Sequence, residues 1–540
     1  MTIPNTVPER DVAGSGLARH AGLTGAATLV SRVLGLVRDQ VIAALFGAGD
    51  EMDAFVVAFR IPNLVRDLFA EGAMSAAFVP TFTAYLTRRG RADAWRLANN
   101  VLTMLTIITG IVVVAGIVFA APLASMYARD YANVPGKLEL TIRLTRVVLP
   151  FLTLVAIAAV AMGMLNSLHH YFVPALSPAM FNVATIVCAI ALVPVMPAFG
   201  WPRIMAVAIG ALVGGVGLVA LQWPALRREG FRFRPVLDAG DPGLRRVLTL
   251  MGPGTIGIAA TQVNLFVNTL LATSQGTGAV SWLTYAFRLM YLPIGLFGVS
   301  IGTAVLPAVS RHAAENDLSG IRTTIRRGLS MMLTVNIPAT IGLIVLAVPI
   351  VELLFERGRF TAADTHATAT ALRMYAVGLV GYSAARITSP TFYALGRPRV
   401  PVIVSICSIA VNVVCSVALV RVMGFSGLAL GTAIAAVVNS AALVWLLRGT
   451  LDGIEGRRLA TTSLKVVAAA AVMAAVCAAI QHALERAVPG SELMARAARL
   501  STSIGGGLVV LAIAGKLLRV EEVDDAIAMI HTRVRKLLTR

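Results

Sequence analysis

Residues 101–123 read VLTMLTIITGIVVVAGIVFAAPL, an apolar run of 23 residues that contains no charged side chain. A helix of this length crosses a hydrocarbon core of roughly 30 Å. Similar runs recur from residue 21 to residue 519, and 57% of the chain is hydrophobic whereas 14% is charged. This composition excludes a soluble enzyme and a disordered chain, and runs this long exclude a β-barrel. The sequence therefore predicts an all-α polytopic membrane protein.

The apolar runs predict fourteen transmembrane helices. Their approximate bounds are residues 21–46, 52–86, 97–125, 144–168, 173–197, 203–226, 247–273, 279–310, 328–352, 371–395, 400–423, 426–448, 463–484 and 498–519. With the N-terminus inside, the cytoplasmic segments hold 28 of the 46 basic residues and the outer segments hold 11. Because Lys and Arg accumulate in cytoplasmic loops, this ratio predicts that both termini are cytoplasmic. Membrane topology thus accounts for much of the formal charge of +19, and nucleic acid is not a predicted partner.

Short motifs repeat at a nearly constant distance along the chain. AFR at residues 58–60 recurs at 286–288, and AL-x-W at 220–223 recurs at 442–445. Coincidence between apolar sequences is the alternative, but the offsets favour two six-helix lobes of parallel orientation, at residues 21–230 and 231–450. Such lobes are typical of transporters, with the substrate site at the lobe interface.

Three further segments lie outside these lobes. Residues 1–20 form a predicted cytoplasmic tail, residues 451–520 hold the last two membrane helices, and residues 521–540 form a predicted cytoplasmic amphipathic helix.

Seven arginines fall inside predicted spans, where each would cost about 2.5–3.5 kcal/mol if it faced lipid at mid-depth. We expect them to face a wet or paired interior, except the one nearest a helix end, Arg146, which can snorkel to the interface. The alternative is a structural ion pair with an acid of the first two spans. The arginines are Arg32, Arg38, Arg60, Arg66, Arg146, Arg288 and Arg386, and the acids are Asp39, Asp53, Asp67 and Glu71.

The second predicted span is too long for one straight crossing. At 1.5 Å per residue, residues 52–86 would extend about 52 Å, so this helix must overshoot the membrane or break, with Pro62 and Gly72 as candidate break points. On a continuous helix, Asp53, Arg60, Asp67 and Glu71 would share one face. The surplus of guanidinium over carboxylate predicts a positive cavity that suits phosphate, because Arg offers a planar fork of donors.

Three longer motifs carry a resemblance to a known family. They are SRVLGLVRDQVIAALFGAG at residues 31–49, DAFVVAFRIPNLVRDLFAEGAMSAAFVP at 53–80 and SWLTYAFRLMYLPIGLFGVSIGTAVLPAVSR at 281–311. The chain resembles the MurJ (MviN) family of lipid II flippases, in the multidrug/oligosaccharidyl-lipid/polysaccharide exporter superfamily. The resemblance implies a transporter, not an enzyme, that moves the undecaprenyl-pyrophosphate-linked peptidoglycan precursor across the bacterial inner membrane by alternating access. It also implies a groove for the lipid tail in residues 451–520.

The resemblance also implies which residues bind substrate. The family's cavity arginines fall on Arg32, Arg38, Arg66 and Arg288, and its acidic cavity positions fall on Asp53 and Glu71. Arg60 and Arg386 join this set because they too lie inside spans. Where many relatives carry acids around the eighth-span arginine, this chain has Phe287 and Tyr291.

No cofactor is predicted, and the four cysteines show no metal-binding spacing. A sodium site described in some relatives would fall on four residues that carry neutral groups here, where carboxylates are expected. We therefore expect the membrane potential, not sodium, to drive transport. The four residues are Asn268, Asn412, Ser416 and Thr432.

The predicted partners are lipid II, the phospholipid bilayer and the cell-wall synthesis machinery. One alternative is an exporter of another anionic polyprenyl-linked glycan, such as an O-antigen unit. A second is a membrane enzyme acting on the same lipid, a glycosyltransferase or a pyrophosphatase. That enzyme would need a carboxylate or histidine pair at a membrane face, and the outer loops at residues 126–143 and 353–370 show no convincing set.

Overall fold

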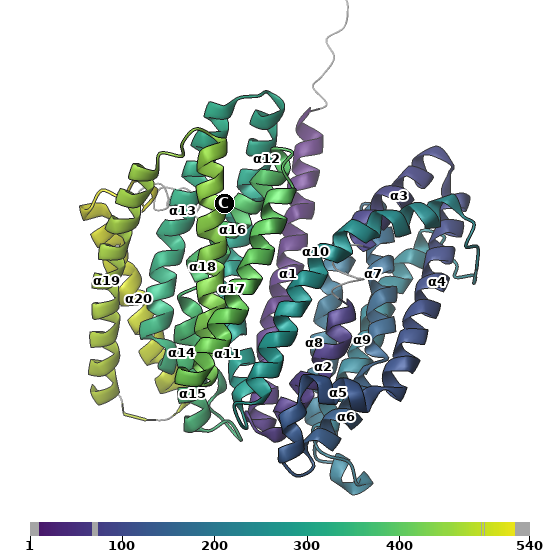
Figure 1. The fold of residues 1–540 in the computed structure, drawn as a ribbon, viewed down its shortest axis with the longest axis horizontal. Coiled ribbons are helices and arrows are strands. Elements are labelled where there is room, and N and C mark those ends of the chain that lie inside the picture. Colours follow the sequence, from purple (N-terminus) through teal and green to yellow (C-terminus); the bar gives the residue numbers. More distant parts are fainter. Residues whose placement is uncertain (1–9, 67–73, 488, 491, 524–540) are drawn as a thin grey trace, which may run out of the picture. The chain divides into compact units, whose positions relative to one another are not determined.

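The computed structural model describes residues 10–66, 74–487, 489–490 and 492–523, and these residues are almost entirely helical (Figure 1). Nine helical segments in this part of the chain are each long and apolar enough to cross a membrane. Every predicted span coincides with one helix or with a few consecutive helices. The prediction of an all-α polytopic membrane protein is confirmed.

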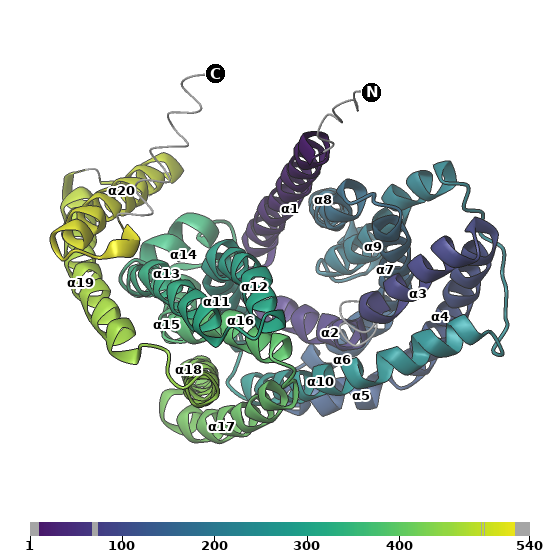
Figure 2. The same ribbon diagram turned by 90° about the horizontal axis from the view of Figure 1, so that it is seen from above.

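The chain divides into two compact units, Met1–Val263 and Asn264–Arg540, and the boundary falls inside α10 (Figures 1 and 2). In unit 1, α1 packs on α8, α8 on α9, α7 on α9, and α2 on α6. The elements of unit 1 are α1 (Arg10–Phe46), α2 (Asp50–Arg66), α3 (Met74–Arg88), α4 (Arg91–Val118), α5 (Ala120–Tyr127), the 3-10 turn η2 (Arg129–Asn133), α6 (Lys137–Val148), α7 (Phe151–Ser167), α8 (Phe172–Leu192), the 3-10 turn η3 (Met196–Phe199), α9 (Met205–Arg228) and the first part of α10 (Pro242–Thr273).

Unit 2 begins with the second part of α10. Its α17 packs on α18, α16 on α18, and α11 on α15, while the final pair of helices, α19 and α20, pack on each other and α19 packs on α13. The remaining elements are α11 (Ala279–Pro293), the π-helical turn η4 (Ile294–Gly298), α12 (Val299–Ala314), α13 (Leu318–Val345), α14 (Ala347–Phe355), α15 (Ala362–Ala376), α16 (Leu379–Ala394), α17 (Arg399–Met423), α18 (Phe425–Thr450), α19 (Gly456–Ala487) and α20 (Leu493–Leu517).

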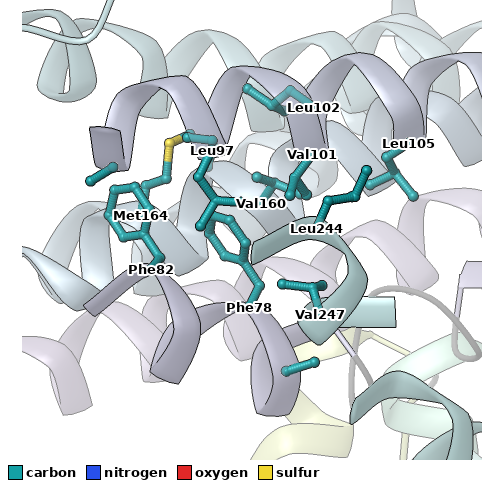
Figure 3. Packing of buried hydrophobic residues seen from close by; sticks show 14 of the residues in the cluster. Phe78, Phe82, Leu97, Val101, Leu102, Leu105, Val160, Met164, Leu244 and Val247 are labelled. Carbon is teal, nitrogen blue, oxygen red and sulfur yellow. The ribbon is translucent and has the colours of Figure 1, made fainter. Parts of the chain in front are cut away.

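An extensive apolar cluster of unit 1 joins α3, α4, α7 and the start of α10 (Figure 3). Phe78 and Phe82 of α3 pack beside Val160 and Met164 of α7, and all four side chains are fully buried. This cluster fixes α3 against α4, α7 and the start of α10.

Two asparagines of α4 hold the extended segment between α9 and α10. Asn99 donates to the Arg232 carbonyl at 3.1 Å, and its own oxygen accepts from the Arg234 amide at 3.1 Å. Asn100 makes the same pair of bonds with the backbone of Asp238, at 2.8 and 3.0 Å. The two side chains act as a neighbouring strand would, because each offers one donor and one acceptor to a backbone that no sheet satisfies.

The eighth predicted span is interrupted within the described residues. In the second span the described part of α2 runs to Arg66 and that of α3 runs from Met74, and residues 67–73 lie outside the described residues. Pro62 lies inside α2 and does not end it, so this predicted break point is wrong, and Gly72 lies outside the described residues. In the eighth span the π-helical turn η4 separates α11 from α12 directly after Pro293, where the missing N–H frees a carbonyl of the preceding turn.

Candidate functional site

Two of the predicted substrate-binding arginines lie on α1, which packs against α8. Asn182 of α8 donates to the Ser31 carbonyl at 3.0 Å and so fixes α1 next to Arg32. The Arg32 side chain is exposed and has no hydrogen bond or ion pair with any residue in the described part of the chain. Its five donors are therefore available to an anionic ligand.

Arg38, almost two helical turns further along α1, is half-buried. Its guanidinium contacts the Asp39 carboxylate at 2.8 Å and lies 5.4 Å from the centre of the Phe181 ring. Phe181 belongs to an aromatic cluster in which Phe59 of α2 and Phe151 of α7 lie within 5.3 Å of each other, centre to centre. This arrangement orients the guanidinium, because the ring face and the carboxylate restrict its rotation.

The other predicted charged residues of unit 1 lie in different surroundings. Arg60 is half-buried on α2, Arg66 is half-buried at the C-terminal end of α2, and Arg146 is exposed near the end of α6. Asp67 and Glu71, which were expected to extend the charged face of the second span, lie outside the described residues.

Asp53 is held in a buried ion pair that the sequence did not reveal. Its carboxylate has no exposed surface and lies 3.0 Å from the ammonium of Lys137, the first residue of α6. The same ammonium contacts Asp50 at 2.7 Å and lies 4.2 Å from the centre of the Tyr131 ring. Lys137, which is only 2% exposed, thus joins α2 to the segment before α6. Burial raises the pKa of Tyr131, while the nearby Arg60 opposes this rise.

In unit 2, the side chains of Arg288 on α11 and of Arg386 on α16 are exposed. Arg386 donates a hydrogen bond to the hydroxyl of Tyr291, one of the two neutral residues noted beside Arg288 in the sequence. The other, Phe287, lies 5.4 Å from the ring of Tyr375 and 6.0 Å from that of Tyr291. The neighbours are thus aromatic rings and a neutral hydroxyl, so the charge of Arg386 is not cancelled by Tyr291.

Three of the four residues at the implied sodium position form a hydrogen-bonded cluster within unit 2. The Ser416 hydroxyl lies 3.1 Å from the Asn412 side-chain oxygen and 3.4 Å from that of Asn268. Asn412 also donates to the side-chain oxygen of Asn264. Thr432 donates to the Leu428 carbonyl of its own helix and lines a cavity of about 120 Å³ together with Asn264 and Asn412. The amide donors and acceptors satisfy one another in a cluster that carries no negative charge.

The helices define a class of protein before any relative is considered. Exposed guanidinium groups on multi-pass helices characterise a membrane transporter for an anionic substrate. The fold is similar to the inward-facing structure of a multidrug resistance MATE family transporter of the MOP superfamily, with a TM-score of 0.63, 18% identity, and coverage of 80% of this chain and 99% of that one.

The chain belongs to the lipid II flippase MurJ family. The family model matches residues 42–497. The probable lipid II flippase MurJ of Bdellovibrio bacteriovorus is 35% identical over 484 residues, which cover 88% of this chain and 91% of the relative. The fold is also similar to a solved lipid II flippase MurJ in the inward closed conformation, with a TM-score of 0.75, 24% identity, and coverage of 92% of this chain and 99% of that one. The resemblance read from the three motifs is confirmed, and the family is one of transporters.

Proposed function

We propose that this protein flips lipid II from the inner to the outer leaflet of the bacterial inner membrane, with both of its termini in the cytoplasm. Membership of the lipid II flippase family supports this function. The observation within the molecule that carries it is Arg32, an arginine inside a membrane helix that is exposed and has no partner in the described residues. An arginine without a partner at this depth is costly unless a ligand or water contacts it.

The pyrophosphate of lipid II offers the chemistry that these arginines match. Each guanidinium can donate two parallel hydrogen bonds to phosphate oxygens, and the positive charge persists at any physiological pH. We infer that Arg32 and Arg38 of unit 1 and Arg288 and Arg386 of unit 2 bind this headgroup during alternating access. The polyprenyl chain would remain in lipid, with α19 and α20 as the groove beside it.

The membrane potential is the proposed driving force. It is negative inside and favours outward movement of an anion, and a charge that crosses 100 mV gains about 2.3 kcal/mol. A headgroup with roughly two negative charges could therefore draw on about 4.6 kcal/mol, less if positive side chains move with it. The neutral cluster of Asn268, Asn412 and Ser416 supports this proposal, because it offers amide and hydroxyl oxygens but no carboxylate to a sodium ion.

Complementation in cells depleted of their own flippase tests this function. We expect Arg32→Ala, Arg38→Ala and Arg288→Ala each to abolish growth at normal protein level, and the Lys variants to restore it only in part, because Lys keeps the charge but loses the fork of donors. Arg146→Ala is the matched control, since Arg146 is exposed near a helix end, and it should support normal growth. Full growth with all three Ala variants would contradict the proposed role of the arginines.

A further inference from the structure

A basic hollow lies at the end of unit 2 where α18 ends and α19 begins. Its volume is about 600 Å³, and it is far along the chain from the arginines assigned to lipid II. The residues whose side chains or backbone line it include Arg448, Glu455, Gly456, Arg457, Arg458 and Thr461.

The loop between α18 and α19, which lines part of this hollow, is held by contacts within unit 2. Leu451 and Ile454 are buried in the apolar core of unit 2, with 0% and 3% of their surface exposed. Arg322 of α13 donates to the Leu451 carbonyl at 3.1 Å, and Arg326 lies 3.3 Å from the carboxylate of Glu455. The loop beside the hollow is therefore anchored to the core of unit 2 and to α13.

The charges of the hollow do not cancel. Glu455 is neutralised by Arg326 and also by Arg458, whose guanidinium lies 3.5 Å from it. Arg448 and Arg457 are exposed, and neither has a hydrogen bond from its side chain or an ion pair within the described residues. Two free guanidinium groups thus face the same hollow, where an anion could bind both.

Exposed apolar side chains continue from each of these arginines toward the middle of the helices. Trp445 lies three residues before Arg448 on α18 and is 72% exposed, and Leu464 lies seven residues after Arg457 on α19 and is also 72% exposed. Residues three or seven apart share one side of a helix. Each helix therefore presents a basic end followed by an apolar surface, the pattern of a tryptophan-flanked membrane interface.

We propose that this hollow binds the phosphate headgroup of an anionic phospholipid of the cytoplasmic leaflet. Arg448 and Arg457 contact the phosphate, and the acyl chains lie along Trp445 and Leu464. A soluble phosphate compound would leave these two apolar side chains unused, which is why we assign a lipid. The proposal uses the cytoplasmic orientation of this end of unit 2, but it does not depend on lipid II transport.

Native mass spectrometry of the delipidated full-length protein in neutral detergent tests this proposal. Phosphatidylglycerol is titrated against phosphatidylcholine with the same acyl chains, for the wild type, for Arg448→Gln with Arg457→Gln, and for Arg421→Gln with Arg486→Gln. The pair Arg421 and Arg486 is the matched control, because its replacement removes the same charge from two exposed arginines that do not line the hollow. They lie in the last turns of α17 and α19.

The wild type and the control pair should prefer phosphatidylglycerol. Each arginine near an anionic lipid surface contributes roughly a fivefold gain in binding, so the Arg448 and Arg457 pair variant should bind phosphatidylglycerol roughly 25-fold more weakly. An unchanged preference in that variant, or an equal loss in the control pair, overturns the proposal. Displacement of the lipid by millimolar glycerol 3-phosphate would show a site for soluble phosphate and would also overturn it. None of these outcomes bears on flipping, which is measured separately.

Discussion

The ion pair between Lys137 and Asp53 allows the most detailed prediction for unit 1. Lys137→Met keeps the length of the side chain but removes the ammonium, so the buried Asp53 carboxylate loses its ion pair with Lys137. Breaking a buried pair on one side typically costs about 3–5 kcal/mol. We expect the upper part of this range, because Lys137 also loses its contacts with Asp50 at 2.7 Å and with the Tyr131 ring.

The assay is thermal unfolding of the purified protein in detergent, followed by loss of the monomer peak in size-exclusion chromatography. Lys137→Met and Asp53→Asn should each lower the midpoint strongly. The double variant should be no less stable than either single variant, because neither buried charge then remains. Lys465→Met is the matched control, since Lys465 is exposed and donates only to the Arg519 carbonyl at 3.2 Å.

Transport by the double variant separates two roles for Asp53. If Asp53 serves to position α2 against α6, the double variant should retain flipping per folded molecule. If its carboxylate contacts the substrate, the double variant should be inactive although it folds. A wild-type midpoint for Lys137→Met would refute the reasoning outright, because the ion pair would then contribute nothing to stability.

Three further predictions concern other contacts. Tyr291→Phe removes the hydroxyl that accepts a hydrogen bond from Arg386, and we expect a modest loss of flipping. Tyr393→Phe, at an exposed position, is the control and should flip at the wild-type rate. Equal loss in both variants would contradict a specific role of the Tyr291 hydroxyl. The hydrogen bond from His170 lowers the pKa of Glu229, so this contact stabilises the protein above the ordinary pKa of a glutamate and is lost as the pH falls through the lowered value. Glu229→Gln should therefore reduce the thermal midpoint at pH 7, and the reduction should shrink steadily as the pH is lowered below the ordinary pKa of a glutamate. A reduction that is the same at every pH would be inconsistent with this linkage. Replacing sodium by potassium at a clamped membrane potential should leave flipping unchanged, and a loss of flipping without sodium would restore an ion site at Asn412.

The helices were predictable from the sequence because the membrane imposes their length and composition. The runs of about twenty apolar residues indicated where the spans lie, and the length of the second span indicated that its helix overshoots the membrane or breaks. Pro62 was a wrong candidate for a break in the second span, since a proline inside a helix can be accommodated by a kink without ending the helix.

The partners of the charged residues were much less predictable. Lys137 is one of four lysines in the chain and lies in a predicted outer loop. Its ion pair with Asp53 was not predictable, because Asp53 lies 84 residues earlier. Only the packing of α2 on α6 brings the two together. The rarity of lysine beside 42 arginines was the one available signal, since the choice of a compact ammonium over a guanidinium suits a small buried site. The contact of Arg386 with Tyr291 likewise joins residues 95 positions apart.

The central claim is that this protein moves lipid II with its arginines, and transport in vesicles tests it most directly. Purified protein is reconstituted with lipid II, the membrane potential is clamped with potassium and valinomycin, and the appearance of the headgroup in the opposite leaflet is followed with an impermeant probe. We predict that the wild type and Arg146→Ala expose lipid II much faster than vesicles without protein, and that Arg32→Ala with Arg38→Ala does not. Exposure by the wild type at the rate of protein-free vesicles, or equal rates for the wild type and the Arg32 and Arg38 double variant, would contradict the claim.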